Sequence, residues 1–148
     1  MGDSVIDCEF CGIVLGVSEA RIVYNTEDVL AFFPLKPATV GHTLLITKAH
    51  VPDIWELTGE QGRSIMQALL KLSSAIRVAV APDGLNIINS AGRAASQTVG
   101  HIHFHLVPRW KDDDFGDIWP PSHFLPEVVK EDVASAIEKA LGQGCVPR

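Results

Sequence analysis

Three histidines alternate with apolar residues in one short segment of the chain, His101-Ile102-His103-Phe104-His105-Leu106-Val107. Side chains two positions apart share one face of a β-strand, so this alternation predicts a strand over residues 101–107 with the imidazoles on one face. Neighbouring histidines of the row would lie about 6.6 Å apart and the outer two about 13 Å, too far for one zinc ion to bind all three. Because histidine titrates near neutral pH, a row of three is a poor choice for a solvated surface. We therefore expect the three histidines to have different functions.

The rest of the chain predicts an α+β fold with a mainly antiparallel five-stranded sheet, one long helix and one short helix. Thr58 and Gln61 have capping-box spacing, and apolar residues recur at helical spacing behind them, which predicts the long helix over about residues 59–80. The short helix is expected at Glu131–Leu141, stopped by Gly142. Runs of β-forming residues between turn signals predict the strands Arg21–Tyr24, Val29–Phe33, His42–Thr47, Leu85–Asn89 and His101–Val107.

Length and composition are those of one globular domain. The chain has 148 residues, 47% of them hydrophobic, and neither a repeat nor a long linker divides it. We expect a single domain over residues 1–148, with its core in 5–110 and a more irregular C-terminal tail in 111–148. The 18 acidic and 12 basic residues give a formal net charge of −6, which argues against nucleic acid as a partner but allows a small anionic ligand.

Targeting and redox features are few. No apolar run reaches the roughly 18 residues of a membrane span, and the first residues show neither a basic signal-peptide region nor a myristoylation pattern. Three cysteines, an odd number, argue against a disulfide framework. These features predict a cytoplasmic protein that works in a reducing compartment and does not bind membranes.

Several motifs, taken in order and spacing over residues 8–109, resemble the histidine triad (HIT) family of nucleotide hydrolases and transferases. The resemblance implies the HIT-like fold, and a twofold homodimer built across the long helix and an edge strand. The motifs that carry it are the histidine row itself, Gln97-Thr98-Val99 before that row, Gly41-His42-Thr43-Leu44-Leu45-Ile46, Lys48-Ala49-His50, and Phe10 with Ile13 near the start.

The same resemblance implies a mechanism. His103, the middle histidine, would attack the α-phosphate of a nucleotide and form a nucleotidyl-histidine, which water then hydrolyses. His105 and His42 would face the same phosphate and stabilise the charge that develops on its oxygens. The other residues implied at this site are Gln97 and Thr98, which would orient the leaving group, and Gly100, which would bring a backbone amide near the phosphate.

A nucleoside needs an apolar slot with a polar rim. Phe10, Ile13 and Leu35 are candidates for the base, although apolar residues in a β-rich segment are also typical of a simple core. Asn89 is a candidate for a ribose or phosphate contact, although an isolated asparagine can instead serve a turn. Pro34 departs from the family, whose members often have Asn or Asp there to bind the ribose hydroxyls, so ribose and base recognition stay open.

Cys8 and Cys11 have half of the spacing of a zinc site, and a buried, redox-idle pair of thiols is the alternative. Some bacterial members of the HIT family resemble this chain in using such cysteines with the first histidine of the row. With His50 and His101, the cysteines would form a closed Cys2His2 tetrahedron, which is typical of structural zinc. We therefore expect one structural zinc ion per chain.

The expected ligand is a small-molecule nucleotide such as AMP or a dinucleoside polyphosphate. Pro108-Arg109 is more similar to the dinucleoside polyphosphate hydrolases, whereas Trp119-Pro120-Pro121 is more similar to the adenosine monophosphoramidases, so both substrate classes stay open. Two other functions are possible on the same residues. One is a non-catalytic nucleotide-binding or regulatory module, and the other is a metal carrier that binds through His103 and His105.

Three features of the chain have no function assigned from sequence. His123 and Cys145 have no identifiable partner. The run Lys111-Asp112-Asp113-Asp114 is expected to be a solvated loop, because consecutive carboxylates in a loop rarely converge on one metal ion.

Overall fold

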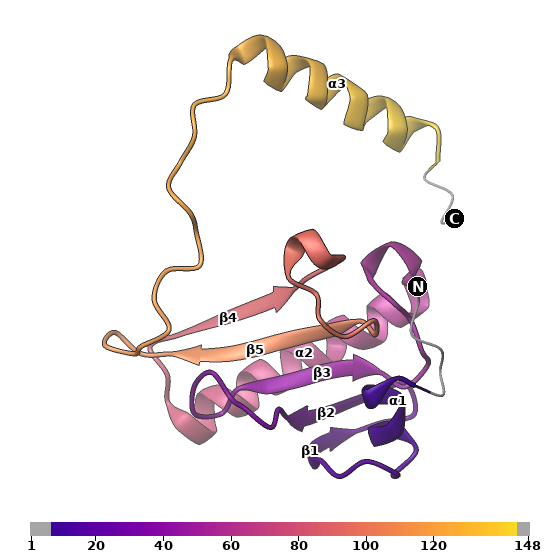
Figure 1. Ribbon diagram of the computed structural model, residues 1–148, viewed down its shortest axis with the longest axis vertical. Coiled ribbons are helices and arrows are strands. Elements are labelled where there is room, and N and C mark those ends of the chain that lie inside the picture. Colours follow the sequence, from indigo (N-terminus) through magenta and orange to yellow (C-terminus); the bar gives the residue numbers. More distant parts are fainter. Residues whose placement is uncertain (1–6, 145–148) are drawn as a thin grey trace. The chain divides into compact units, whose positions relative to one another are not determined.

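The computed structural model describes residues 7–144. Its centre is a five-stranded sheet in the order β1-β2-β3-β5-β4, with every neighbouring pair antiparallel (Figure 1). This confirms the predicted antiparallel five-stranded sheet. The strands are β1 (Arg21–Asn25), β2 (Val29–Phe33), β3 (Thr43–Thr47), β4 (Gly84–Asn89) and β5 (His103–Arg109).

The strand of the histidine row begins later than its alternation predicts. β5 starts at His103 and continues to Arg109, whereas the sequence predicts a strand over His101–Val107. The reason lies in the backbone, because the Ile102 amide donates to the carbonyl of Val51 at 2.6 Å rather than to a neighbouring strand. His101 therefore stands just outside the sheet, and its side chain is fully buried there.

The long helix α2 (Gly59–Val80) has the predicted bounds and the predicted capping box. Thr58 Oγ1 accepts from the Gln61 amide at 3.2 Å, and Gln61 Oε1 accepts from the Thr58 amide at 3.0 Å. Its buried stripe packs on one face of the sheet, which Figure 1 shows with α2 behind the strands. The resulting core contains Val29, Ala31, Leu45, Ile65, Ala68, Leu69, Leu72, Ile76 and Leu106.

On the opposite face of the sheet α1 (Glu9–Val14), a helix that the sequence did not predict, packs on β2 and β3. Figure 1 shows α1 in front of the strands. Its buried residues pack on Leu30, Phe32, Leu44 and Ile46. Ile46 lies opposite His103 and Leu44 lies opposite His105 in the register of β3 and β5. Because directly opposed residues share a face, both histidines lie on the α1 side.

Residues 7–115 form one compact unit, and residues 116–144 form a second. Two short 3₁₀ helices, η1 (Ile54–Glu56) and η2 (Arg93–Ala95), belong to the first unit. The second contains α3 (Glu127–Gly142), which begins four residues before the predicted start at Glu131. Its first turn begins directly after the N-cap Pro126, whose carbonyl accepts from the backbone amides of Val129 and Lys130 at 3.1 and 3.3 Å.

No helix among residues 7–144 has the length and hydropathy needed to cross a membrane.

Of the two residues without a predicted function, His123 is exposed in the extended segment before α3, and Cys145 lies outside the described residues. Asp113, within the acidic run, bonds the Arg109 guanidinium at 2.7 and 2.9 Å and accepts from the backbone amides of Trp110 and Phe115. These bonds hold the pKa of the Asp113 carboxyl well below its usual range.

Candidate functional site

His103 is held at the beginning of β5 by its own ring and by its backbone. Its Nδ1–H donates to the carbonyl of His101 at 2.7 Å, since a carbonyl can only accept. In the neutral ring, Nε2 then has no hydrogen and presents its lone pair. Asn89 Nδ2 donates to the His103 carbonyl at 2.9 Å, and the Phe10 ring lies edge-on at 5.3 Å between centroids. The side chain is only 6% exposed, so its orientation is fixed.

His42 and His105 form a chain of hydrogen bonds that determines where their protons are. The Ala38 amide donates to His42 Nδ1 at 3.0 Å, so the proton of the neutral His42 ring is on Nε2. His42 Nε2 lies 2.9 Å from His105 Nδ1 and donates to it. The remaining proton of His105 is therefore on Nε2. The rings of His103 and His105 lie 5.0 Å apart between centroids, so the ring with a free lone pair and the ring with a free donor are neighbours.

Burial keeps this pair of histidines neutral at physiological pH. It lowers the pKa of His105 to about 4, with a further contribution from the neighbouring His103 and His42 rings. Burial also lowers the pKa of His42. Neutral rings are what the hydrogen-bond chain requires, because a doubly protonated His42 could not accept from Ala38.

The expectation that His42 faces the phosphate stays a prediction. In the structure both of its ring nitrogens are hydrogen-bonded, to Ala38 and to His105, so its direct contact is with the His105 ring. Of the four ring nitrogens of His42 and His105, Nε2 of His105 is the one that takes no part in these bonds.

Four buried or half-buried side chains gather at the other end of the histidine row, Cys8, Cys11, His50 and His101. Their ligand atoms all lie within 4.8 Å of one another. His101 Nε2–H donates to the Thr47 carbonyl at 2.8 Å, which leaves Nδ1 free to face the two sulfurs at 3.5 and 3.6 Å. His50 Nδ1 lies 3.2 Å from Cys11 Sγ.

These distances fit a tetrahedral metal site. Around a zinc ion with ordinary Zn–S and Zn–N bonds, neighbouring sulfur and nitrogen ligands lie about 3.5 Å apart. Two thiols and two imidazoles are also a donor set that zinc prefers, and the Thr47 carbonyl supplies the outer partner that a ligating histidine usually has. Burial, together with the adjacent Cys8 thiol, raises the pKa of Cys11 to about 11, and burial lowers that of His101 to about 4. These four residues could hold a divalent metal ion.

Gln97 holds the loop between β4 and β5 rather than pointing into open space. Its Oε1 accepts from the Gly92 amide at 2.7 Å, and its Nε2 donates to the carbonyls of Pro52 and Val99 at 2.7 and 3.0 Å. All polar groups of the amide are thus bonded to backbone. Thr98 is exposed and Gly100 is half-buried in the same loop.

The expected nucleoside residues do not form one group. Phe10 and Ile13 are buried with α1 in the apolar cluster under β2 and β3. Leu35, by contrast, is 87% exposed and is not part of that cluster. Asn89 is bonded to the His103 backbone, and Pro34 is half-buried with no polar side-chain atom.

Two contributions to the site were missed from sequence. The helix α1, which brings both cysteines to the histidines, is too short to give a helical pattern. The Ala38 amide that orients His42 is a backbone group, which any non-proline residue would supply, so no side-chain signal marks it.

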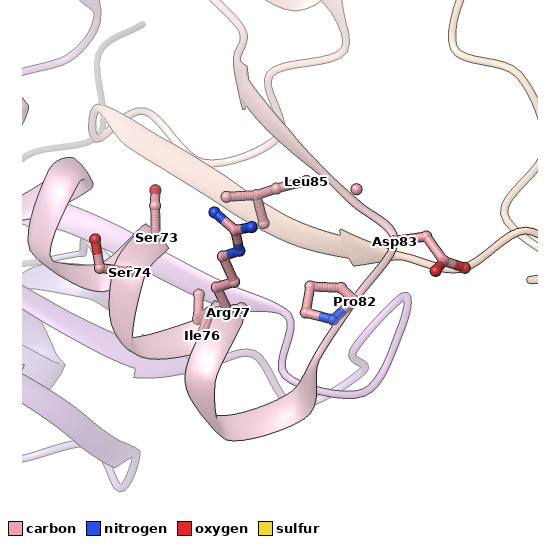
Figure 2. A pocket seen from close by; sticks show the side chains of 8 residues that line it. Ser73, Ser74, Ile76, Arg77, Pro82, Asp83 and Leu85 are labelled. Atoms are coloured by element: carbon pink, nitrogen blue, oxygen red, sulfur yellow. The ribbon is translucent and has the colours of Figure 1, made fainter.

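A hollow of about 380 Å³ lies away from the histidines, between the last turns of α2 and the start of β4 (Figure 2). Ser73, Arg77 and Leu85 are among its lining residues. The two serines there, Ser73 and Ser74, bond the carbonyls of Leu69 and Leu70 in their own helix. None of the predicted site residues lines this hollow.

Comparison with known proteins gives the family. The HIT domain matches residues 16–112, which contain the histidine row and the strands around it. The chain belongs to the HIT family. The crystal structure of SMU.412c from Streptococcus mutans UA159 superposes with a TM-score of 0.87 at 42% identity, over 95% of this chain and 89% of that one.

Other HIT proteins are similar over nearly the whole chain. Protein hit of Bacillus subtilis is 38% identical over 91% of this chain and 94% of its own. The adenosine 5'-monophosphoramidase hnt1 of Schizosaccharomyces pombe is 33% identical over 90% of this chain and all of its own. A zinc-bound histidine triad family protein from Mycobacterium smegmatis has a TM-score of 0.72 at 33% identity, over 95% of this chain and 96% of that one.

Proposed function

We propose that this HIT protein is a hydrolase that cleaves a nucleotide at its α-phosphate through a nucleotidyl intermediate on His103. The observation that carries the proposal is the bonding of the His103 ring. Its Nδ1–H is held by the His101 carbonyl, so Nε2 is the free nucleophilic atom. The activity of the fission yeast relative, an adenosine 5'-monophosphoramidase, supports a hydrolytic function. A nucleoside phosphoramidate and a dinucleoside polyphosphate are both candidate substrates.

In this mechanism His103 Nε2 attacks the α-phosphorus, and the bond to the leaving group breaks with its electron pair staying on the leaving atom. An amine leaving group takes a proton from solvent as it departs. His105 donates its Nε2–H to a nonbridging oxygen, where negative charge increases in the transition state. His42 positions His105 through the 2.9 Å bond and the Ala38 amide. Water then attacks the phosphorus, the P–N bond breaks, and AMP leaves while His103 returns to its neutral form. Asn89 keeps the β5 backbone in place through its bond to the His103 carbonyl.

The test combines turnover with detection of the intermediate. Adenosine phosphoramidate, AMP-lysine, Ap3A and Ap4A are compared by kcat/KM, and the protein is quenched during turnover for mass spectrometry. We expect a mass increase of one adenylyl group, which is AMP less one water, on His103, and a loss of kcat/KM by about a thousandfold or more in His103→Ala. His123→Ala, an exposed histidine in the second unit, is the matched control.

The result also separates the alternative functions. A nucleotide-binding module without catalysis would turn over none of the four compounds and would keep its AMP affinity in His103→Ala. A metal carrier acting through His103 and His105 would lose bound metal in that variant. Either result would overturn the hydrolase proposal.

We propose that Cys8, Cys11, His50 and His101 hold one structural zinc ion. When bound, zinc with four protein ligands supplies no open coordination position, so its contribution is to hold the segments together. The spacing of the four donors supports this, as does the zinc in the Mycobacterium smegmatis relative. Cysteine thiols must stay reduced to bind zinc, and the cytoplasm keeps them reduced, so we propose a cytoplasmic location.

We propose that the protein is a homodimer that uses α2 and the edge strand β4. Met66 and Leu70 lie one turn apart on α2 and are 56% and 64% exposed, and Ile87 on β4 is 47% exposed. An apolar stripe beside a free strand edge is a surface that a second copy could cover. Sedimentation equilibrium should give twice the chain mass of 16.0 kDa. Leu70→Asp should shift the mass towards the monomer, and a monomeric wild type would overturn this proposal.

A further inference from the structure

We propose that Arg93 forms a subsite for an anionic leaving group, so that this chain prefers a nucleotide whose α-phosphate is joined to a phosphate or sulfate over one joined to an amine. The inference rests on the proposed function, since it assigns the substrate class of the same site. It starts from the loop between β4 and β5, which runs directly into the strand of His103 (Figure 1).

The loop is a preformed support rather than a loose connection. The Gly92 backbone amide donates to the side-chain oxygen Oε1 of Gln97, and the Gln97 backbone amide donates to the Gly92 carbonyl at 3.1 Å. Between them, η2 makes one tight turn, which ends at Ser96 in the left-handed region with φ 68°. Gln97 also bonds Pro52 and Val99, which ties the turn to the segments that carry His50 and His101. These hydrogen bonds fix the position of the Arg93 backbone, from which its side chain extends.

A hollow of about 460 Å³ opens on this turn, lined by Arg93, Ser96, Gln97 and Thr98. Its groups are one guanidinium, two hydroxyls and an amide already bonded to backbone. Arg93 is also the only residue between Gly84 and Gly100 with a charge at neutral pH. In a chain with a net charge of −6, this stretch is therefore locally positive. Within residues 7–144 the hollow is lined by no carboxylate, and the guanidinium is its one charged group, so an external anion is a suitable ligand for it.

The chemistry of the leaving group decides what such a hollow favours. When His103 Nε2 forms its bond to phosphorus, the electron pair of the broken P–O bond stays on the leaving oxygen of a nucleoside polyphosphate or a sulfate. A guanidinium and hydroxyl donors stabilise that oxyanion. An amine leaving group instead needs a proton on nitrogen, and a lysine-type amine is repelled by a nearby cation. Water then releases AMP and a proton, as for either class.

The experiment compares substrates that share the adenylyl group and differ only in the leaving group. Ap4A and adenylyl sulfate represent the phosphate and sulfate arms, and adenosine phosphoramidate and AMP-lysine represent amines. We expect Arg93→Ala to lower the ratio of kcat/KM for Ap4A to kcat/KM for the phosphoramidate about fivefold, and Arg93→Glu about 20-fold. Arg93→Lys should restore part of the ratio. Arg63→Ala, an exposed arginine on α2, is the matched control and should leave the ratio unchanged.

The dependence of the kcat/KM ratio on ionic strength distinguishes an electrostatic role of Arg93 from a merely structural one. In the wild type the ratio should fall as NaCl rises from about 50 to about 500 mM, because the guanidinium is exposed and screened. In Arg93→Ala this salt dependence should be absent. An equal loss of activity toward all four compounds, or an unchanged ratio, would overturn the inference.

Binding separates a failure of this inference from a failure of the proposed function. If the wild type cleaves none of the compounds, the hydrolase proposal is overturned. The subsite is then judged by titrating His103→Ala with ATP and with AMP, each with and without Arg93→Ala. The inference requires that loss of Arg93 weaken ATP binding more than AMP binding, and equal weakening contradicts it.

Discussion

His103 donates its Nδ1–H to the backbone carbonyl of His101 over 2.7 Å, and the side chain of His101 belongs to the cluster with Cys8 and Cys11. One residue thus contacts the proposed nucleophile with its backbone and the proposed metal with its ring. A change at the metal site should therefore reach the His103 ring through a single peptide group.

Loss of the metal ligands should remove the zinc and lower stability. Cys8→Ser is expected to lose the one equivalent of zinc per chain and to lower Tm by about 6 °C, equivalent to about 2 kcal/mol of unfolding free energy. Elemental analysis and thermal unfolding measure the two effects. Cys145→Ser should keep both the zinc and the Tm. A Cys8→Ser protein with a full equivalent of zinc would contradict the assigned ligands.

Removal of His42 should act on catalysis through His105. His42→Ala deletes the donor to His105 Nδ1 and one of the rings that lower the His105 pKa, so this pKa should rise from about 4 toward its ordinary value. The kcat should fall about tenfold or more, because His105 is no longer oriented. NMR titration of the imidazole carbons measures the pKa. An unchanged His105 titration would show that His42 does not position this ring.

Stability should depend on pH in a window set by the buried histidines. Between about 6.5, the ordinary histidine pKa, and the lowered value near 4 for His105, the unfolded chain binds a proton that the folded protein does not. The free energy of unfolding should therefore fall as pH falls through this window, by about 1 kcal/mol between pH 7 and pH 5 once solvent screening is allowed for. Urea unfolding at the two pH values measures it. His105→Gln should reduce the difference, and an equal fall in that variant would exclude His105 as the cause.

The α2 face of the sheet should carry most of the packing energy. Leu69 is 4% exposed between α2 and the strands, so Leu69→Ala should cost about 3 kcal/mol of unfolding free energy. Val78, on the same helix, is 87% exposed, and Val78→Ala should change it by less than about 0.5 kcal/mol. Denaturant unfolding compares the two. Similar costs would mean that α2 does not pack as described.

Asn89 should affect rate more than affinity. Its side-chain amide bonds the His103 carbonyl, so Asn89→Ala should lower kcat several-fold while KM for the nucleotide changes little. Steady-state kinetics separate the two constants. If KM rises and kcat does not change, Asn89 contacts the ribose or phosphate instead, which is the function suggested by sequence alone.

Periodic features could be predicted from sequence, and contacts between distant backbone groups could not. The bounds of α2 follow from its capping box and apolar spacing, and β2 was predicted residue for residue. The two cysteines and two histidines of the cluster were grouped through their number and the family resemblance. The start of β5 was wrong because the Ile102 amide pairs with Val51, fifty-one residues earlier, which no local pattern reveals.

For His42 and Gln97, the sequence indicates the available chemistry but not the hydrogen bonds that these side chains make within the protein. Residue type indicates which groups a side chain offers, but not which of them are already bonded within the protein. Both side chains use all their polar atoms internally, His42 on Ala38 and His105, and Gln97 on the backbone of its own loop and of Pro52. Leu35 shows the reverse, an apolar residue left at the surface.

The alternation along β5 divides the strand between two kinds of evolutionary constraint. Phe104 and Leu106 face the α2 core, while His103 and His105 face the α1 side. Substitutions that adapt the chemistry to a new leaving group can thus accumulate on one face, or in the loop before it, without weakening the main packing layer on the other. A fold arranged in this way can accept new substrates while its core stays intact. In directed evolution of this chain, we expect positions in the β4–β5 loop to tolerate substitution more readily than positions in the strand.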